Sequence, residues 1–140
     1  MRANPEDIVD QLKRLKNLEE CVLLEVVWHN YALDVDLVFD YIWDEKGNIR
    51  KDLDTPKRLV LSFYLVQEFH FQANLNDSMC LEPERINWGI NEVALVKLND
   101  TPDFLHRYTG LSIPIHHIEV VWEDERRISI IFNRMASHFD

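Results

Sequence analysis

The sequence predicts a single α+β domain, in which an N-terminal helix packs on a mainly antiparallel β-sheet or sandwich of about six to eight strands. Apolar residues recur at helical spacing in the first 20 residues, and from residue 21 onward the spacing changes to every second residue. A chain of 140 residues with 46% hydrophobic residues is long enough for one core and too short for two. We therefore expect one domain over residues 1–140, with the helix in 1–20 and a β-rich body in 21–140.

The stretch NPEDIVDQLKRLKNLEE has the composition of a helix start. Asn4 is suited to the N-cap and Pro5 to the first helical position, where the missing N–H costs nothing. Ile8, Leu12 and Leu15 then fall on one side of the helix. This apolar stripe predicts that the helix packs on the sheet.

The next two segments, CVLLEVVWH and ALDVDLVFDYIW, predict a β-hairpin with a tight turn at Asn30-Tyr31. A two-residue turn there places Val26 opposite Val35. It also sorts the large apolar side chains of both strands onto one face, which we expect to be the core face.

The remaining elements follow from turns and alternation. Gly47 and the DTP stretch at 54–56 indicate turns, and residues 57–72 read as one long strand. Residues 85–98 predict another strand with a bend at Gly89, and 103–110 a short helical turn. Residues 118–135 predict a hairpin whose tip is Asp124-Glu125.

The second strand of the predicted β-hairpin contains three aspartates, and these need an explanation because aspartate is a poor strand former. The predicted register puts Asp34, Asp36 and Asp40 on the face opposite the core, with Asp36 directly across from Glu25. One interpretation is a polar outer face in contact with water. The other is a surface that binds a cation, most simply a basic protein partner, with these four acids as the contact residues.

The net charge and composition of the chain disfavour several classes of function. Fifteen basic residues against 25 acidic ones give a net charge of -10, which disfavours nucleic acids and anionic membranes and favours basic partners. No apolar run reaches the roughly 18 residues of a membrane span, and the N-terminus lacks an apolar signal segment. Two cysteines form no disulfide framework. We expect a cytoplasmic protein without a cofactor, and a homodimer is compatible with the sequence.

Residue chemistry gives little support for catalysis. Glu68 and His70 lie on one face of a predicted strand, and His29 and Trp88 are candidates to complete a pocket there. A zinc site needs three or four ligands, and only two are assembled by local sequence, so we predict no metal site. A small-molecule-binding or weakly enzymatic domain with a pocket near these residues is the alternative to a non-catalytic binding protein.

The stretches RLVLSFYLVQEFHF and INEVALVKL have an apolar spacing that resembles immunity proteins of polymorphic toxin systems and similar small bacterial β-rich domains. The resemblance covers about half the chain. It implies a non-enzymatic protein that covers a toxin, and the acidic charge is compatible with a basic toxin as partner.

Overall fold

The computed structural model describes residues 5–85, 92–99, 106–122 and 126–140, and it contains two four-stranded antiparallel sheets. The first sheet has the order β1 (Val22–His29), β2 (Asp34–Asp40), β3 (Arg58–Tyr64), β8 (Arg134–Phe139). The second has the order β4 (Glu68–Gln72), β7 (Arg127–Phe132), β6 (His116–Val121), β5 (Leu95–Leu98). The mainly antiparallel sandwich expected from the alternating pattern is thus confirmed.

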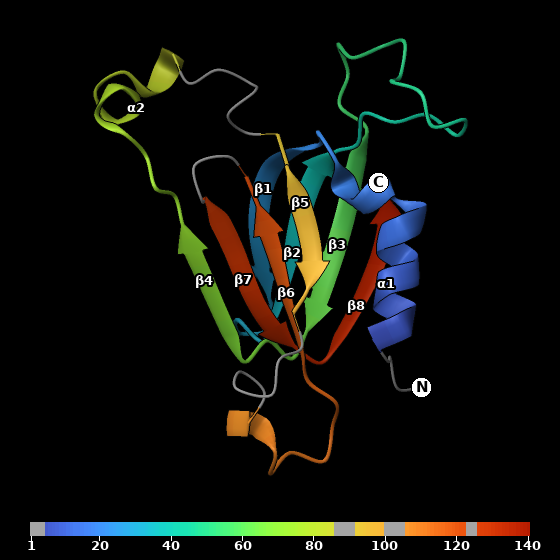
Figure 1. Ribbon diagram of the computed structural model, residues 1–140, viewed down its shortest axis with the longest axis vertical. Helices are drawn as coiled ribbons and strands as arrows, with labels where there is room; N and C mark the ends of the chain where they lie inside the picture. Colours follow the sequence, from blue (N-terminus) through green and yellow to red (C-terminus); the bar gives the residue numbers. More distant parts are fainter. Residues whose placement is uncertain (1–4, 86–91, 100–105, 123–125) are drawn as a thin grey trace.

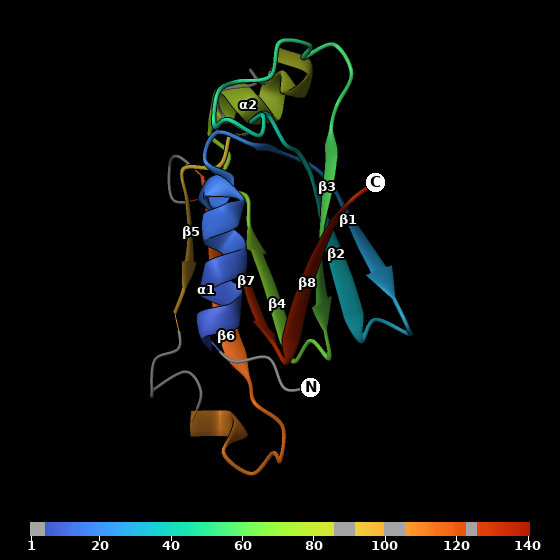
Figure 2. The ribbon, with the colours of Figure 1, turned by 90° about the vertical axis from the view of Figure 1, so that its right-hand side faces the viewer.

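The two sheets meet where β3 continues into β4 and β7 continues into β8, and they diverge from that line (Figure 2). At this junction Gln67 N–H donates to the carbonyl of Ile131 at 2.7 Å, and Asn133 N–H donates to the carbonyl of Tyr64 at 3.0 Å. Leu65 has a positive φ of 52°, which ends β3. The prediction of one continuous strand over 57–72 is therefore wrong, because the chain leaves one sheet and enters the other at residues 65–67.

Helix α1 (Pro5–Arg14) lies beside the edge strands β8 and β5 (Figures 1 and 2). The predicted apolar stripe is confirmed, since Ile8 and Leu12 are buried in the core. Gln11 fixes the helix to β8, where its side chain donates to the carbonyl of Met135 at 3.4 Å and accepts from the Ser137 hydroxyl at 3.2 Å. Helical structure is shorter than the predicted 1–20: α1 ends at Arg14 and the 3-10 turn η1 (Lys16–Leu18) follows.

The other helical segments in the described residues are short: α2 (Asp77–Leu81), η2 (Pro83–Arg85) and η4 (His106–Tyr108). Helix is a small part of the chain, so the α+β class is only loosely supported. The predicted helical turn at 103–110 corresponds in part to η4. The predicted N-cap at residue 4, the bend at 89 and the hairpin tip at 124–125 lie outside the described residues. No helix in the described part of the chain combines the length and apolarity needed to cross a membrane.

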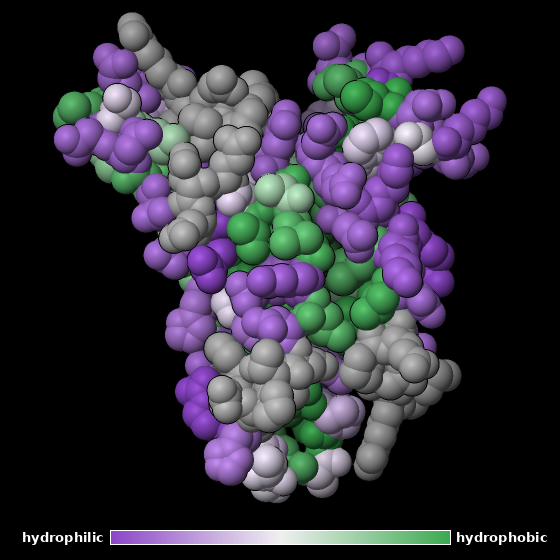
Figure 3. Space-filling model, in the orientation of Figure 1, coloured by the Kyte–Doolittle hydropathy of each residue, from purple (hydrophilic) through white to green (hydrophobic). Residues whose placement is uncertain are grey.

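The core lies between the two sheets and α1. Fully buried side chains come from every layer, and the largest are Phe39, Phe63, Phe132, Ile8, Leu18, Leu37, Leu59, Leu61, Ile118, Ile128, Ile130 and Ile131. Figure 3 shows hydrophobic side chains also reaching the surface in the middle of one face, near β5 and toward α1, with hydrophilic residues around them.

The hairpin of β1 and β2 exists, but its predicted register is wrong. Val26 pairs with Leu37 rather than with Val35, because the connection spans residues 30–33 instead of two residues. Asn30, Tyr31 and Ala32 have φ values of 51°, 59° and 66° in that connection.

A β-bulge between Leu23 and Glu25 changes which side chains of β1 face the core. After the bulge, Val26 and Trp28 point between the sheets as predicted. Before it, Cys21 and Leu23 take that side, because the extra residue reverses the alternation. On β2 the alternation is as predicted: Val35, Leu37 and Phe39 belong to the core, and the three aspartates lie on the opposite face.

Candidate functional site

Asp34 lies on the predicted outer face but is 9% exposed, because the chain at Leu65 folds over it. One carboxylate oxygen accepts a hydrogen bond from the backbone N–H of Leu65 at 3.0 Å, and the other accepts from the side-chain amide of Asn30. The residue therefore joins the β1–β2 connection to the junction between the sheets. Its carboxylate is engaged within the protein.

Asp40 has the same role at the other end of β2. It is also 9% exposed, and one oxygen accepts from the Arg50 guanidinium and from the backbone N–H of Lys57, each at 3.0 Å. Arg50 in turn donates to the carbonyl of Tyr41 at 2.7 Å. These contacts tie the long loop at 41–57 to the sheet.

Asp36 and Glu25 are the two predicted contact residues that reach the surface. Asp36 accepts from His29 at 2.8 Å and pairs in the sheet with Val27, so the expected like-charge pair of Asp36 and Glu25 is wrong. Glu25 forms an ion pair with Arg58, whose guanidinium also contacts Asp140 at 3.2 Å. Each of the two acids is therefore next to a cationic or ionisable group.

Glu68 and His70 lie together on the outer face of β4, as the sequence predicts. His70 Nε2 is 3.1 Å from one Glu68 oxygen, and the other oxygen receives the Arg107 guanidinium at 2.8 Å and the Tyr108 hydroxyl. Partial burial acts to raise the pKa of Glu68, but the hydrogen bonds from Tyr108 and His70 and the charge of Arg107 outweigh it and lower the pKa. The same contacts, together with burial, raise the pKa of Tyr108 to about 12.

His29 is not part of this cluster. Trp28 and Phe69 point toward each other across the gap between the sheets, with ring centroids 5.1 Å apart. Because strand neighbours alternate in direction, His29 and Glu68 face away from each other on opposite outer faces. Trp88, the fourth residue of the predicted pocket, lies outside the described residues.

Within the described ranges, no three histidine, cysteine, aspartate or glutamate side chains are grouped closely enough to hold a metal ion. The donors around Glu68 already occupy its oxygens, so this cluster acts to dock η4 on β4.

A buried polar network on β6 and β7 was not found from the sequence. His117 Nε2 is 2.6 Å from the Ser129 hydroxyl, and its Nδ1 is 3.1 Å from the carbonyl of Asn99. A carbonyl only accepts, so Nδ1 carries the hydrogen and Nε2 accepts from the serine. This is the arrangement of a nucleophile and its base, but the serine is 9% exposed and the histidine 1%. Only the register of β6 and β7 brings the two residues together, and the sequence does not reveal that register.

Four large apolar side chains form what we call the hairpin patch: Trp28, Tyr31, Leu33 and Leu65. Tyr31 and Leu33 lie in the β1–β2 connection, Leu65 lies in the junction between β3 and β4, and Trp28 lies near the end of β1. The connection and the junction are neighbours, since Val66 N–H donates to the carbonyl of Leu33 at 2.7 Å. The exposed fractions of the four side chains run from 40% for Leu65 to full exposure for Tyr31. The hydrophobic pattern predicts Trp28 and Leu33 on the core face. Trp28 does point between the sheets toward Phe69, but the two side chains keep exposed fractions of 42% and 50% at this end of the hairpin.

Comparison with known proteins gives information on the fold and none on the function. No protein-family model matches the chain, and no curated protein matches it. Among solved structures, an uncharacterized protein from Neisseria gonorrhoeae is similar, with a TM-score of 0.51 and 12% sequence identity. The similarity covers 86% of this chain and 91% of that chain.

Proposed function

We propose that this protein is a non-catalytic protein-interaction domain that binds its partner through the hairpin patch. The observation that carries the proposal is the exposure of the patch, with Tyr31 entirely in solvent and Trp28 and Leu33 about half exposed. Single exposed apolar residues are common on protein surfaces, but a cluster with aromatic members is typical of interfaces. The backbone at 30–32 is compatible with this assignment, because three successive non-glycine residues adopt positive φ there, as they also do at 16–18, and such unfavourable conformations tend to accumulate at functional sites.

The charge of the chain favours a basic partner. The net charge of -10 attracts cationic surfaces over several ångströms and speeds their association. The outer face of β1 and β2 presents Asp36 and, farther from the patch, Glu25. Each is in contact with a group that a partner's arginine or lysine can replace. Asp34 and Asp40 are instead engaged in holding loops, so we assign the acidic contacts to Glu25 and Asp36.

Neutralisation of a basic toxin is the most concrete form of this proposal. The resemblance of the stretches at 58–71 and 90–98 to immunity proteins supports it, and so does a binding surface that needs no catalytic group. A partner of that kind is a nuclease or another basic enzyme whose active site this acidic protein covers.

The proposal is tested by co-purification from the native host with a pair of double variants. Replacement of Tyr31 and Leu33 by serine removes two patch side chains. Replacement of Ile49 and Leu53 by serine removes two apolar side chains of the loop at 41–57 that are each 51% exposed, about the same fraction as Leu33. Loss of two interface anchors weakens binding by about 2–4 kcal/mol, or roughly 30- to 700-fold in Kd. We expect one basic protein to be retained by the wild type and by the Ile49/Leu53 variant, and lost by the Tyr31/Leu33 variant.

Titration calorimetry with the identified partner then gives the two Kd values. Equal retention by both double variants contradicts the assignment of the patch. Sedimentation analysis covers the remaining case: a dimer that the Tyr31/Leu33 variant dissociates assigns the patch to self-association and overturns the partner proposal.

A further inference from the structure

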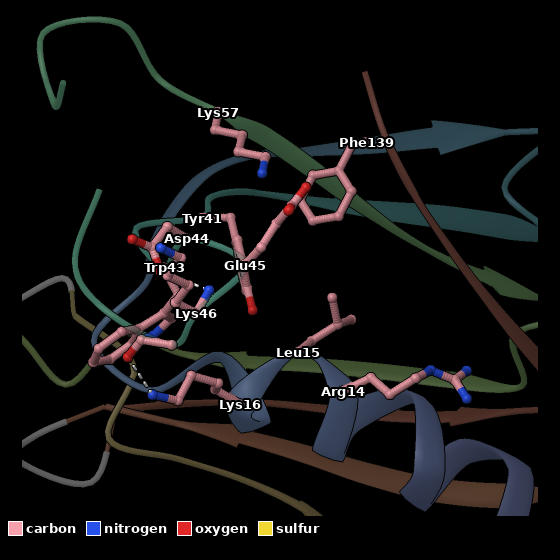
Figure 4. A pocket seen from close by; sticks show the side chains of 11 residues that line it. Arg14, Leu15, Lys16, Tyr41, Trp43, Asp44, Glu45, Lys46, Lys57 and Phe139 are labelled. Atoms are coloured by element: carbon pink, nitrogen blue, oxygen red, sulfur yellow. Dashed lines mark hydrogen bonds between the residues drawn. The ribbon is translucent and has the colours of Figure 1, made fainter. Parts of the chain in front are cut away.

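A pocket of about 510 Å³ lies at the other end of β2 from the hairpin patch. It is bounded by the last residues of α1 and η1, by the chain at 41–47, and by Lys57 and Phe139 at the ends of β3 and β8 (Figure 4). This volume falls within the range of small-molecule sites. Leu15 and Tyr41 point into it from opposite sides (Figure 4).

The Tyr41 hydroxyl is free to bind a ligand. The residue is 6% exposed, its side chain points into the pocket, and its hydroxyl makes no hydrogen bond with any residue in the described ranges. Burial, and to a smaller extent the nearby Cys21, raise the pKa of Tyr41, so the group remains a neutral hydroxyl and a hydrogen-bond donor at physiological pH. The hydroxyl is not among the fully buried polar atoms of the described residues, so it is reached from the pocket, where water or a polar group of a ligand can bond to it.

The charged groups of the pocket oppose the charge of the whole chain. Four basic residues line it against two acidic ones, whereas the chain has 15 basic and 25 acidic residues. Of the two acids, Asp44 is engaged in its own turn, where one oxygen accepts from the backbone N–H groups of Lys46 and Asn48. Glu45 is exposed at the rim.

The ammonium groups of Lys16 and Lys57 differ in the contacts that they make. Lys16 is fixed, because its ammonium donates to the carbonyl of Gly47 at 2.9 Å and lies 4.0 Å from the centre of the Trp43 ring. Lys57 has no carboxylate within ion-pair distance among the described residues, and its ammonium lies 4.6 Å from the centre of the Phe139 ring. Lys57 and the Tyr41 hydroxyl are therefore available donors next to a flat aromatic surface. Arg14 and Lys46, the other two basic residues of the lining, are exposed side chains.

The end of α1 does not cancel this preference. A helix C-terminus carries a partial negative charge that repels anions, but the last turn of α1 contains Lys13 and Arg14, which compensate it.

We propose that this pocket binds a small organic anion with a flat apolar body. The carboxylate or similar group of the ligand contacts the Lys57 ammonium and the Tyr41 hydroxyl, and the flat part packs on Phe139 and Leu15. A donor on the ligand, such as a ring N–H, finds the Glu45 carboxylate at the rim. This inference does not depend on the protein-binding proposal, because the two sites are at opposite ends of the molecule and share no residue.

Three indole derivatives of nearly equal size and different charge test the proposal: indole-3-acetate, indole-3-ethanol and tryptamine. Binding is followed by NMR on the indole N–H signals of ¹⁵N-labelled protein, with the Trp43 signal assigned from Trp43→Phe. Trp43 donates to the carbonyl of Glu19 at 2.8 Å at the edge of the pocket, so its signal reports occupancy. We expect indole-3-acetate to bind at least tenfold more tightly than indole-3-ethanol, and tryptamine to bind most weakly. Equal affinities, or no shift of the Trp43 signal, overturn the proposal.

Matched variants locate the contacts. Lys57→Gln and Tyr41→Phe should each weaken indole-3-acetate by about tenfold or more, because each removes a hydrogen bond to a charged group. Lys57→Gln should leave indole-3-ethanol unchanged, and Lys51→Gln, at an exposed lysine of the same loop, should leave both ligands unchanged. Unchanged binding of indole-3-acetate to folded Lys57→Gln refutes the assignment, even if Tyr41→Phe fails to fold.

Discussion

Replacing Asp34 should destabilise the fold far more than replacing Asp36, although the two residues share one face of one strand. The Asp34 carboxylate accepts the backbone N–H of Leu65 and the side-chain amide of Asn30, and the residue is 9% exposed. A hydrogen bond to a charged group contributes about 1.5–3 kcal/mol, and a buried donor left without a partner adds its own cost. For Asp34→Ala we therefore expect a loss of about 2–4 kcal/mol in the free energy of unfolding.

This loss is a large share of the roughly 5–15 kcal/mol that stabilises a domain. For a chain of this size, 1 kcal/mol corresponds to about 3 °C in Tm, so Asp34→Ala should lower Tm by roughly 6–12 °C. Asp34→Asn retains an oxygen that can accept from Leu65 but places an NH₂ group beside Asn30, so its loss should be intermediate. Asp36→Ala removes one surface contact to His29 and should cost less than about 1 kcal/mol.

Urea unfolding monitored by circular dichroism measures the three variants against the wild type. The slope of free energy against denaturant should stay the same, so that a change in midpoint reports stability alone. If Asp34→Ala and Asp36→Ala lose equal free energy, or if Asp34→Ala loses less than about 1 kcal/mol, the structural role of Asp34 is wrong.

Three further predictions use ionisable groups. Because the folded pKa of Tyr108 is raised to about 12, its contribution to stability is complete below pH 10 and is lost as pH rises toward 12. The difference between the absorbance titrations of wild type and Tyr108→Phe at 295 nm should show an ionisation step at about that pH. A step near pH 10 contradicts the prediction. The pKa of Glu68 is lowered, so its contribution to stability is present above the unfolded pKa and is lost as pH falls through the folded pKa. Glu68→Gln should therefore weaken the loss of stability at acidic pH. An unchanged acidic limb of the stability–pH curve contradicts this. Burial raises the pKa of Cys21 to about 11 while Cys80 is exposed, so a thiol reagent should modify one group quickly in native protein, and Cys80→Ser should abolish that fast reaction.

The sequence predicts local features of this fold well and junctions poorly. Helical spacing located α1, and alternation located the core side chains of β2 and β3, because both patterns depend on residues close in the chain. The bulge at Leu24 reversed the alternation in β1 without any glycine or proline to mark it. At Leu65 the apolar alternation continues through the junction, so nothing in the pattern shows that the chain leaves one sheet for another.

The candidate site was predicted in part for the same reason. The outward direction of the three aspartates was correct, and so was the pairing of Glu68 with His70, since i and i+2 on a strand share a face. Burial of Asp34 and Asp40 was not predictable, because the groups that cover them come from residues 65 and 50–57, and those contacts depend on tertiary structure.

The positions of the aspartates explain why a strand contains such poor strand formers. Asp34 and Asp40 are the first and last residues of β2, where the ladder of backbone bonds gives way to loops and N–H groups need acceptors. The carboxylates supply these acceptors at both ends, so they are less available for direct contact with another molecule. For the basic partner proposed above, exposed acids without an ion pair among the described residues, such as Asp52 and Asp54, contribute to the long-range attraction. Substitution of these two acids by asparagine should reduce mainly the association rate and its salt dependence, whereas loss of the hairpin patch should increase mainly the dissociation rate.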